Sequence, residues 1–484
     1  MRSRTLICIT AISLLAALAN PVQLAAQHTR YKLIDLGTLG GPNSATNGGP
    51  PSMINNGGLI AGMADTTAPC AYLGGVLSPA VKWEKGVPIN LGLLPGGCFS
   101  LPNSINGKGM IVGSGDIGVL DPIWGPVIRA DFRYKGQVID LGTFGGNNSL
   151  ANNVNSRGQV VGGAENTDPD PWDFGGIVGL PSPTAWHGFA WQDGVLLDLG
   201  TLGGPDSFAG VINENGQIAG FSFTNSIPSP VFGIPTADPF LWDRGSMNDL
   251  GTLGGTFGLA TALNNRGQVV GFSDVAGDLA NHAFIWERNV LTDIGTLGGD
   301  NSTANWINEG GQVAGISDLA DGTHHAFVWK DGNFTDLGTI DGDPCSNTEY
   351  INNRGQVIGT STDCHGTILH IFLWENGSMI DLSSQVLPGS GFVLLEPVVI
   401  NEPGEIVVFG ILSNGDNHAV LLKPCSVSCD AQAASSLKNE SAASQFAAKT
   451  RTALREGTYT SPIERMRAQM RYRFSIPEVR GPRQ

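Results

Sequence analysis

Residues 282–315 read HAFIWERNVLTDIGTLGGDNSTANWINEGGQVAG, and this stretch decides the fold of the chain. It holds an aromatic strand that ends at Trp286, a loop that starts at Asp293 and a turn that starts at Asn308. These elements recur in the same order along the chain, which is the signature of a repeat architecture. The loop element begins at Asp35, Asn90, Asp140, Asp198, Asp249, Asp293, Asp336 and Asp381. The Asn-x-x-Gly turn begins at Asn55, Asn106, Asn155, Asn213, Asn264, Asn308, Asn352 and Asn401. The aromatic strand ends at Trp83, Tyr134, Trp191, Trp242, Trp286, Trp329, Trp374 and, without an aromatic residue, Leu422.

Each repeat predicts four short strands. Residues 326–329 (AFVW) have apolar groups on both faces, which favours a strand packed between two sheets. The Asp331-Gly332 pair predicts a tight hairpin, and Asn264 to Gly267 fits a type I turn that leads into the next strand. Asp249 and Asp293 are 44 residues apart, which matches a four-stranded propeller blade of about 40–45 residues.

The order of the elements at the two ends of the chain predicts a closed ring. The chain opens with the second predicted strand of a unit, at Tyr31 to Leu36, and closes with the aromatic strand at His418 to Leu422. One blade built from both ends removes the open sheet edges, whereas an open solenoid needs capping repeats that this sequence lacks. We therefore predict an all-β, closed β-propeller of about eight four-stranded blades, followed by a C-terminal extension. The second and eighth units are degenerate, so seven blades is the alternative.

The N-terminus reads as a secretory signal peptide. Arg2 and Arg4 precede an apolar run from Leu6 to Ala19, and small residues follow at Ala25 and Ala26. This run is shorter than the roughly 20 apolar residues of a membrane span. We expect a signal peptide at 1–26, a propeller at 27–424 and a basic, flexible or partly helical tail at 425–484. The mature chain is expected to lack a transmembrane segment and to be secreted, periplasmic or extracellular.

Six cysteines remain after the signal peptide, and an exported chain permits disulfides between them. Cys345 lies just before a third predicted strand and Cys364 just after the fourth. Because these strands are antiparallel neighbours, their Cα atoms come within disulfide range, and we predict a Cys345–Cys364 bond. The alternative is that Cys345 and Cys364 are two buried free thiols. The remaining candidates pair as Cys70 with Cys98 and Cys425 with Cys429. No zinc-type or redox spacing occurs among the six.

The His-Ala-Phe-x-Trp strands (His282 to Trp286, His325 to Trp329) and the Asp-Leu-Gly-Thr-Leu-Gly-Gly loops (Asp35 to Gly41, Asp198 to Gly204, Asp249 to Gly255) resemble the bacterial HAF-repeat family of predicted extracellular proteins. The resemblance covers roughly Asp35 to Leu422 and implies an extracellular address. It implies no activity, because the family has none established.

The repeated polar residues are better explained by structural hydrogen bonds than by catalysis or metal binding. A ring of histidines at one repeat position could bind a metal, but equivalent residues of different blades lie too far apart for ligands that must be within about 2 Å of the ion. We expect these histidines to have a structural role, such as a hydrogen bond to the neighbouring blade, and the repeated aspartates to accept from nearby backbone N–H groups. The Gly-Gly pairs are expected to form turns. Asp318 to Gly322 and Gly299 to Ser302 offer only a weak calcium signal. The histidines concerned are His187, His282, His325, His370 and His418.

The composition excludes some classes of function but does not identify one. Glycine makes up 68 of 484 residues and charged residues only 14%, which favours frequent turns between short strands. A net charge of −16 argues against nucleic acid as a partner. No catalytic motif, metal site or cofactor motif is present, so we expect a monomeric, non-catalytic binding or scaffold module for a protein or polysaccharide ligand. The alternative is a glycan- or polymer-acting hydrolase or lyase with a site at the channel mouth, built from insertions 64–81, 166–187 and 223–239.

Overall fold

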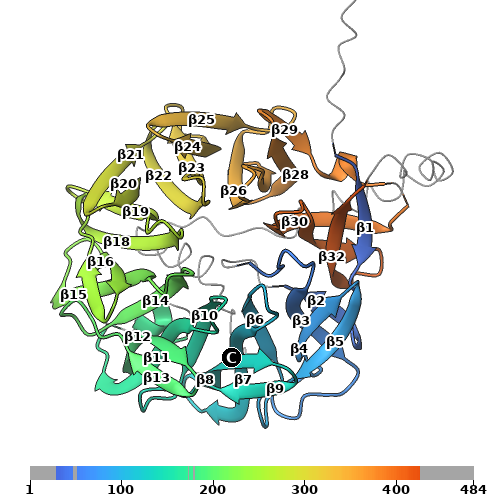
Figure 1. Cartoon of the computed structure of the whole chain (residues 1–484), viewed down its shortest axis with the longest axis horizontal. Helices are drawn as coiled ribbons and strands as arrows, with labels where there is room; N and C mark the ends of the chain where they lie inside the picture. Colours follow the sequence, from blue (N-terminus) through green and yellow to red (C-terminus); the bar gives the residue numbers. More distant parts are fainter. Residues whose placement is uncertain (1–28, 47–51, 173, 178–179, 388, 426–484) are drawn as a thin grey trace, which may run out of the picture.

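The computed structural model describes residues 29–46, 52–172, 174–177, 180–387 and 389–425, and these form a ring of blades (Figure 1). The predicted signal peptide, Cys429 and residues 426–484 of the tail lie outside this part. There are six four-stranded sheets and one eight-stranded sheet. The eight-stranded sheet consists of two blades joined by a single parallel bridge between Ala237 and Phe257. The ring therefore has eight blades, which confirms the predicted propeller and corrects the alternative of seven.

Within each blade the strands are antiparallel neighbours, and the first strand named below lies nearest the centre of the ring (Figure 1). Blade 1 comprises β30 (Phe392–Ile400), β31 (Ile406–Leu412), β32 (Asn417–Pro424) and β1 (Tyr31–Asp35); blade 2 comprises β2 (Gly40–Ala45), β3 (Ile60–Thr66), β4 (Ala80–Glu84) and β5 (Val87–Gly92). Blade 3 comprises β6 (Ser100–Ile105), β7 (Ile111–Asp121), β8 (Gly125–Tyr134) and β9 (Gln137–Asp140); blade 4 comprises β10 (Ser149–Val154), β11 (Val160–Pro169), β12 (Thr184–Gln192) and β13 (Val195–Asp198). Blade 5 comprises β14 (Ser207–Ile212), β15 (Ile218–Pro228), β16 (Pro235–Asp243) and β17 (Ser246–Asp249); blade 6 comprises β18 (Gly254–Leu263), β19 (Val269–Val275), β20 (Asn281–Glu287) and β21 (Val290–Gly295). Blade 7 comprises β22 (Gly298–Ile307), β23 (Val313–Leu319), β24 (His324–Lys330) and β25 (Asn333–Gly338); blade 8 comprises β26 (Cys345–Ile351), β27 (Val357–Thr362), β28 (Ile368–Glu375) and β29 (Ser378–Asp381). Two short helices, α1 (Phe174–Ile177) and η1 (Ser383–Gln385), lie in loops.

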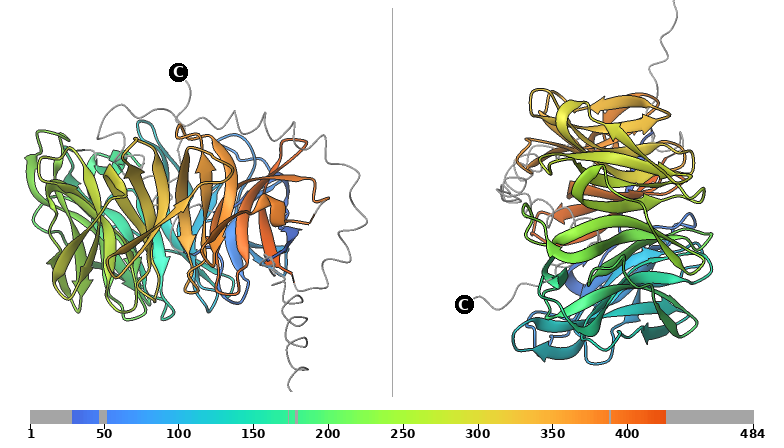
Figure 2. Two further views of the ribbon diagram at one scale, coloured as in Figure 1. Left: turned by 90° about the horizontal axis from the view of Figure 1, so that it is seen from above. Right: turned by 90° about the vertical axis from the view of Figure 1, so that its left-hand side faces the viewer.

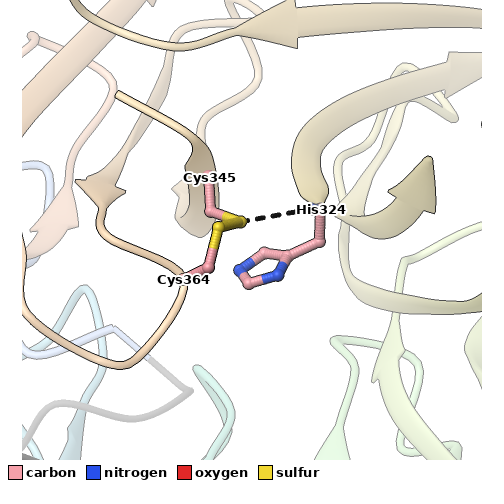
Figure 3. A group of neighbouring side chains, drawn as sticks. All are labelled: His324, Cys345 and Cys364. Carbon is pink, nitrogen blue, oxygen red and sulfur yellow. Dashed lines mark hydrogen bonds between the residues drawn. A yellow bond between two sulfur atoms is a disulfide. The ribbon is translucent and has the colours of Figure 1, made fainter. Parts of the chain in front are cut away.

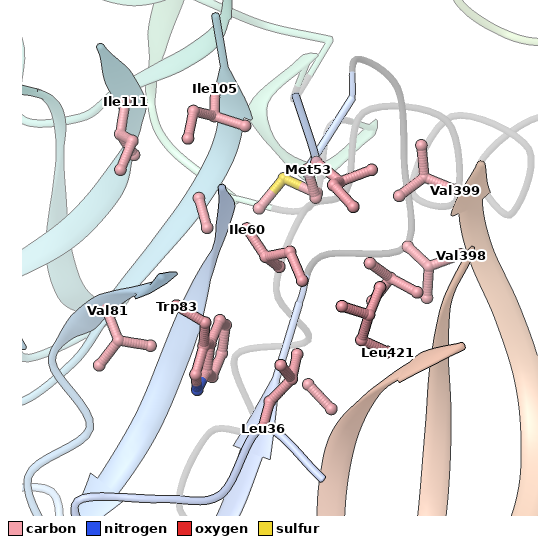
Figure 4. Close-up of a cluster of buried hydrophobic side chains, with 14 of the residues drawn as sticks. Leu36, Met53, Ile60, Val81, Trp83, Ile105, Ile111, Val398, Val399 and Leu421 are labelled. Atoms are coloured by element: carbon pink, nitrogen blue, oxygen red, sulfur yellow. The ribbon is translucent and has the colours of Figure 1, made fainter. Parts of the chain in front are cut away.

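Strands from the two ends of the chain close the ring, as the split order of elements predicts. β1 pairs with β32 in antiparallel register from Tyr31 opposite Pro424 to Asp35 opposite Val420. A buried cluster beside this pair joins Leu36 and Ile60, near the N-terminus, to Val399 and Leu421, near the C-terminus (Figure 4). Hydrogen bonding and apolar packing therefore hold the two ends together.

The repeated glycine of the second strand allows the aromatic strand to pack closely. In blade 7, Gly315 lies opposite Phe327 in the register. A Cβ on Gly315 would come within 2.1 Å of the Thr303 carbonyl oxygen and 2.8 Å of the Phe327 ring. The same glycine–phenylalanine pairing occurs at Gly271 with Phe284 and at Gly359 with Phe372. The HAF and GQVVG motifs therefore form the two sides of one core contact in blades 4 to 8.

A closed ring of side-chain hydrogen bonds links all eight blades. The amide nitrogen of each repeated asparagine donates to the backbone carbonyl of its equivalent in the next blade, at donor–acceptor distances from 2.8 to 3.2 Å. The series ends with Asn401, in blade 1, donating to Asn55, in blade 2. The other side-chain atom, Oδ1, accepts from the turn itself; in Asn264 it accepts from the N–H groups of Arg266 and Gln268. The Asn-x-x-Gly element therefore shapes its own turn, as predicted, and also joins neighbouring blades.

Replacing one member of this asparagine ring should destabilise the protein. Asn264 is buried, and Asn264→Ala would leave two N–H groups and the Asn308 carbonyl without their partner. An unsatisfied buried group costs about 1–3 kcal/mol, so we expect a loss of at least ~2 kcal/mol in chemical denaturation. Asn265→Ala is the matched control, because the bonds of its exposed side chain to Glu309 can be replaced by water. Equal effects of the two variants would contradict this role.

The disulfide predictions are confirmed for two pairs. Cys345 and Cys364 are bonded with their Cα atoms 5.2 Å apart, and Cys70 and Cys98 with theirs 5.5 Å apart. Cys345 starts β26 opposite Thr362, the last residue of β27, so the bond closes the end of this strand pair. In the part of the chain that the structure describes, no helix has the length and apolar character needed to cross a membrane.

Candidate functional site

The ring has two chemically different faces, between which the strands run (Figure 2). Because the four strands of a blade alternate in direction, the connections between first and second strands and between third and fourth strands share one face, the turn face. The connections between second and third strands, and those from one blade to the next, lie on the opposite loop face. All three long insertions, 64–81, 166–187 and 223–239, join second to third strands and so belong to the loop face.

Charge is segregated between the two faces. Among the described residues, no connection on the loop face contains a lysine or arginine, and Arg129 lies within β8. Exposed carboxylates of the loop face are those of Asp35, Asp140, Asp168, Asp198, Asp249, Asp293, Asp300, Asp321, Asp336 and Asp341. Turn-face connections carry Lys85, Lys108, Lys135, Arg157, Arg244, Arg266, Arg288 and Arg354. The described loop-face connections therefore carry an excess of negative charge, which can attract cations.

Large apolar side chains stand exposed at the tips of the same loops. Ile123 is 80% exposed and Leu279 is 91% exposed, in blades 3 and 6. Others are Leu73 in blade 2, Val119, Leu120 and Trp124 in blade 3, and Ile227 and Val231 in blade 5. Val87, Val195 and Val290, beside turn-face hairpins, are exposed as well, but the loop face has more such residues and includes the aromatic ring of Trp124.

A cavity of about 260 Å³ opens on the loop face between blades 3 and 4. Trp124 and Asp121 come from blade 3, whereas Asn147, Glu165 and Thr184 come from blade 4. Glu165 is buried and accepts from the backbone N–H groups of Asn147 and Asn148, at 2.8 and 3.0 Å. Its oxygens are thus committed to holding the loop, and the exposed Asn147 side chain and the Trp124 ring remain to contact a ligand.

The repeated histidines have structural roles, as expected, and the partners of their Nδ1 atoms are aspartates. Nδ1 of His187, His282 and His325 bonds to the aspartate eleven residues later in its own blade, at 2.8 to 2.9 Å, and not to the neighbouring blade. His418 pairs with Asp35, which also belongs to its own closing blade. His370 instead bonds to Asp343, in the loop that enters its blade. The aspartates accept a backbone N–H two residues later, as expected; the Gly295 N–H, for example, bonds to Asp293.

The contact between His187 and Asp198 shifts the pKa of both side chains. Burial disfavours a charged His187, but the hydrogen bond and the charge of Asp198 outweigh it and raise the imidazole pKa. For Asp198, burial alone would raise the pKa, and the bonds from His187 and the Gly200 N–H lower it. In blade 5 the position of the histidine is taken by Asp238, where burial and the nearby Asp249 raise the pKa to about 7.

The two segments with a weak calcium signal do not form a site. Asp318 accepts from the Asn301 side chain at 2.7 Å, and Asp321 accepts from Thr323. Gly298 has a φ of 113°, and a Cβ on Gly299 would lie 2.6 Å from the Leu319 carbonyl oxygen, so the backbone requires glycine here; the pair opens β22 and does not form the predicted turn. Within the described ranges, one group of His, Cys and acidic side chains is close enough to share a metal ion, namely His324, Cys345 and Cys364.

A buried carboxyl group, Asp206, underlies the insertion of blade 4. Its Oδ1 accepts the Trp186 N–H at 2.8 Å, and its Oδ2 has no hydrogen-bond partner. Burial, together with the charge of Asp170, raises the Asp206 pKa to about 8, against the opposing effect of the Trp186 bond. Equivalent loops have asparagine here: Asn148 donates to Glu165, and Asn301 donates to Asp318. In blade 5 the residue equivalent to Glu165 and Asp318 is Phe223, so Asp206 lacks that acceptor, and burial and the charge of Asp170 account for its raised pKa.

Comparison with known proteins does not identify a function for this chain. No protein-family model matches the chain, and no curated protein does. The β-propeller domain of the Trilobed protease from Pyrococcus furiosus is 9% identical, over 67% of this chain and 94% of that one, with a TM-score of 0.38. TolB from Acinetobacter baumannii is 12% identical, over 62% and 76%, with a TM-score of 0.31. A Trypanosoma rangeli sialidase is 10% identical, over 70% and 55%, with a TM-score of 0.29. Likenesses this weak carry no argument about activity.

Proposed function

We propose that this chain is an exported, non-catalytic binding module that captures a cationic ligand on its loop face. The observation that carries the proposal is the charge segregation, since the described loop-face connections hold many carboxylates and no lysine or arginine. Such a surface raises the local concentration of cations and the rate of their association. Export by a signal peptide and membership of the HAF-repeat family are parts of this proposal.

The apolar loop tips favour a basic peptide or protein segment as the ligand. Small cations would need only the carboxylates, whereas Ile123, Trp124 and Leu279 offer apolar contacts that a peptide side chain can use. Aromatic anchors such as Trp124 commonly dominate the energy of peptide and protein interfaces. The cavity beside Trp124 can hold one side chain of such a segment.

Catalysis by the insertions has less support. Asp206 is fully buried, and Glu165 is buried and bonded to the backbone of its own loop. General acid and base groups must lie within hydrogen-bond reach of a bound substrate. These two carboxyl groups instead act within the protein, so the hydrolase or lyase alternative lacks a supporting observation.

Neutralising the loop face should weaken binding of a basic peptide. The triple variant Asp168→Asn, Asp300→Asn, Asp341→Asn removes three exposed charges from this face. We expect its affinity for a fluorescent peptide of alternating lysine and leucine to fall at least ~5-fold at low ionic strength, with a weaker salt dependence. Fluorescence anisotropy measures both quantities.

The matched control is Glu84→Gln, Asp193→Asn, Asp331→Asn, which removes the same charge from the turn face. Its affinity should stay close to that of the parent protein. Equal losses in the two triple variants would mean that net charge alone attracts the peptide. No binding by the parent at low salt would exclude a basic peptide as the ligand.

A further inference from the structure

Three side chains with metal-binding atoms meet where blades 7 and 8 adjoin on the loop face (Figure 3). His324 is the first residue of β24, Cys345 the first of β26, and Cys364 follows β27. Their ligand atoms all lie within 4.8 Å of one another. The two sulfur atoms are joined in the disulfide, and the imidazole ring lies beside it (Figure 3).

We propose that reduction of the Cys345–Cys364 disulfide creates a binding site for a thiophilic divalent metal such as Zn²⁺, with His324 as the third ligand. One nitrogen and two sulfur ligands form a three-residue set that zinc accepts, which leaves a fourth position for water or another ligand. This proposal is independent of cationic-peptide capture. In this proposal, the oxidised cysteines form a covalent cross-link and the reduced cysteines form part of a metal site.

The reducing step needs an external dithiol. The disulfide gains two electrons and two protons and becomes two thiols, while the dithiol loses the same and becomes a disulfide. The metal then displaces the two thiol protons, because the thiolate is the ligand. The bound product is one metal ion, two thiolates and a neutral imidazole.

The surroundings favour this arrangement. The backbone N–H of His324 donates to Cys345 Sγ at 3.3 Å, a contact that stabilises negative charge on a thiolate. The Asn347 side chain, two residues after Cys345 in β26, lies near the imidazole of His324, and outer contacts of this kind orient metal-binding histidines. Two sulfurs on a tetrahedral zinc lie about 3.8 Å apart, given a Zn–S bond of about 2.3 Å. Side-chain rotation can supply this separation, because the Cα atoms are already only 5.2 Å apart.

The test uses the full chain with Cys8, Cys70, Cys98, Cys425 and Cys429 replaced by serine, so that one pair of thiols remains. After reduction by dithiothreitol and anaerobic removal of the reagent, Co²⁺ is added as a spectroscopic substitute for Zn²⁺. We expect thiolate-to-cobalt absorption that saturates at one ion per chain and is displaced by Zn²⁺. His324→Ala should weaken binding at least ~10-fold, and the oxidised protein should show no such absorption.

The matched control keeps only Cys70 and Cys98, which have no third ligand of this kind among the described residues. It should bind Co²⁺ no better than the His324→Ala variant. Circular dichroism of each reduced variant establishes that the strands persist. The proposal is wrong if the reduced, folded protein gives no cobalt absorption, or if His324→Ala binds as tightly as its parent.

Discussion

Removal of residues 29–36 is expected to open the ring and cost at least ~5 kcal/mol of stability. This deletion takes away β1, and with it the antiparallel partner of β32 and the fully buried side chains of Tyr31 and Leu36. Burying one such side chain is worth about 1.5–3 kcal/mol, and the strand adds its hydrogen bonds. The exposed edge of β32 would also be free to pair with another chain. Thermal unfolding and size-exclusion chromatography measure the two consequences.

Deletion of residues 426–484 is the matched control, since it shortens the other end without touching the described ring. Its unfolding temperature should stay within a few degrees of that of the parent protein. A protein that lacks 29–36 but melts like the parent and remains monomeric would contradict closure by β1.

Asp206→Asn is expected to stabilise the protein near pH 8. Asp206 has a pKa of about 8 in the folded protein, far above the value of about 3.9 for an unperturbed aspartate. The folded state therefore holds this proton more tightly than the unfolded state, so stability falls as pH rises from about 4 to about 8. Asparagine keeps the acceptor for the Trp186 N–H and stays uncharged at every pH, so the cost of burying a carboxylate is avoided. We expect a gain on the order of 3 kcal/mol at pH 8, which shrinks toward pH 4.

Chemical denaturation of both proteins across this pH range measures the effect. The reverse change at the equivalent position, Asn148→Asp, places a second carboxyl group beside Glu165 and should destabilise the protein increasingly as pH rises. If the Asp206→Asn difference is independent of pH, the carboxyl group is not protonated in the folded protein.

The repeat predicted the blades because most of the blade structure depends on interactions between residues that are close in sequence. Hairpin turns such as Asp331-Gly332 and the doubly apolar strand at 326–329 depend on neighbours in sequence, and the split of blade 1 can be read from the order of its elements. The Cys345–Cys364 bond was predictable for the same reason, since its strands are joined by a short turn.

Contacts between blades were harder to predict. Asn264 reads as a turn residue, and its bond to Asn308 exists only once the neighbouring blade is in place. The histidine partners did leave a signal, because His282 and Asp293 keep a spacing of eleven residues that recurs in other blades. His324 gives no spacing signal, since Cys345 reaches it from the next blade.

Blade 3 shows why the number of blades was hard to count from the degenerate repeats. The sequence aligns Tyr134 with the repeated tryptophan, but the register places Asp131 opposite Asp140, where blades 4 to 8 have phenylalanine. Arg133 then takes the position of the tryptophan and pairs with Asp131 in the core at 2.9 Å. A buried ion pair replaces an aromatic pair, so the motif disappears while the strand remains.

Hydrogen–deuterium exchange with and without the lysine–leucine peptide tests the central claim, that ligands bind on the loop face, most directly. The account predicts slower exchange at loop-face amides, such as those of residues 122–124, 199–206 and 296–301, and no change at turn-face residues 156–158 and 265–267. Protection confined to the turn face, with the loop face unchanged while the peptide is bound, would contradict it.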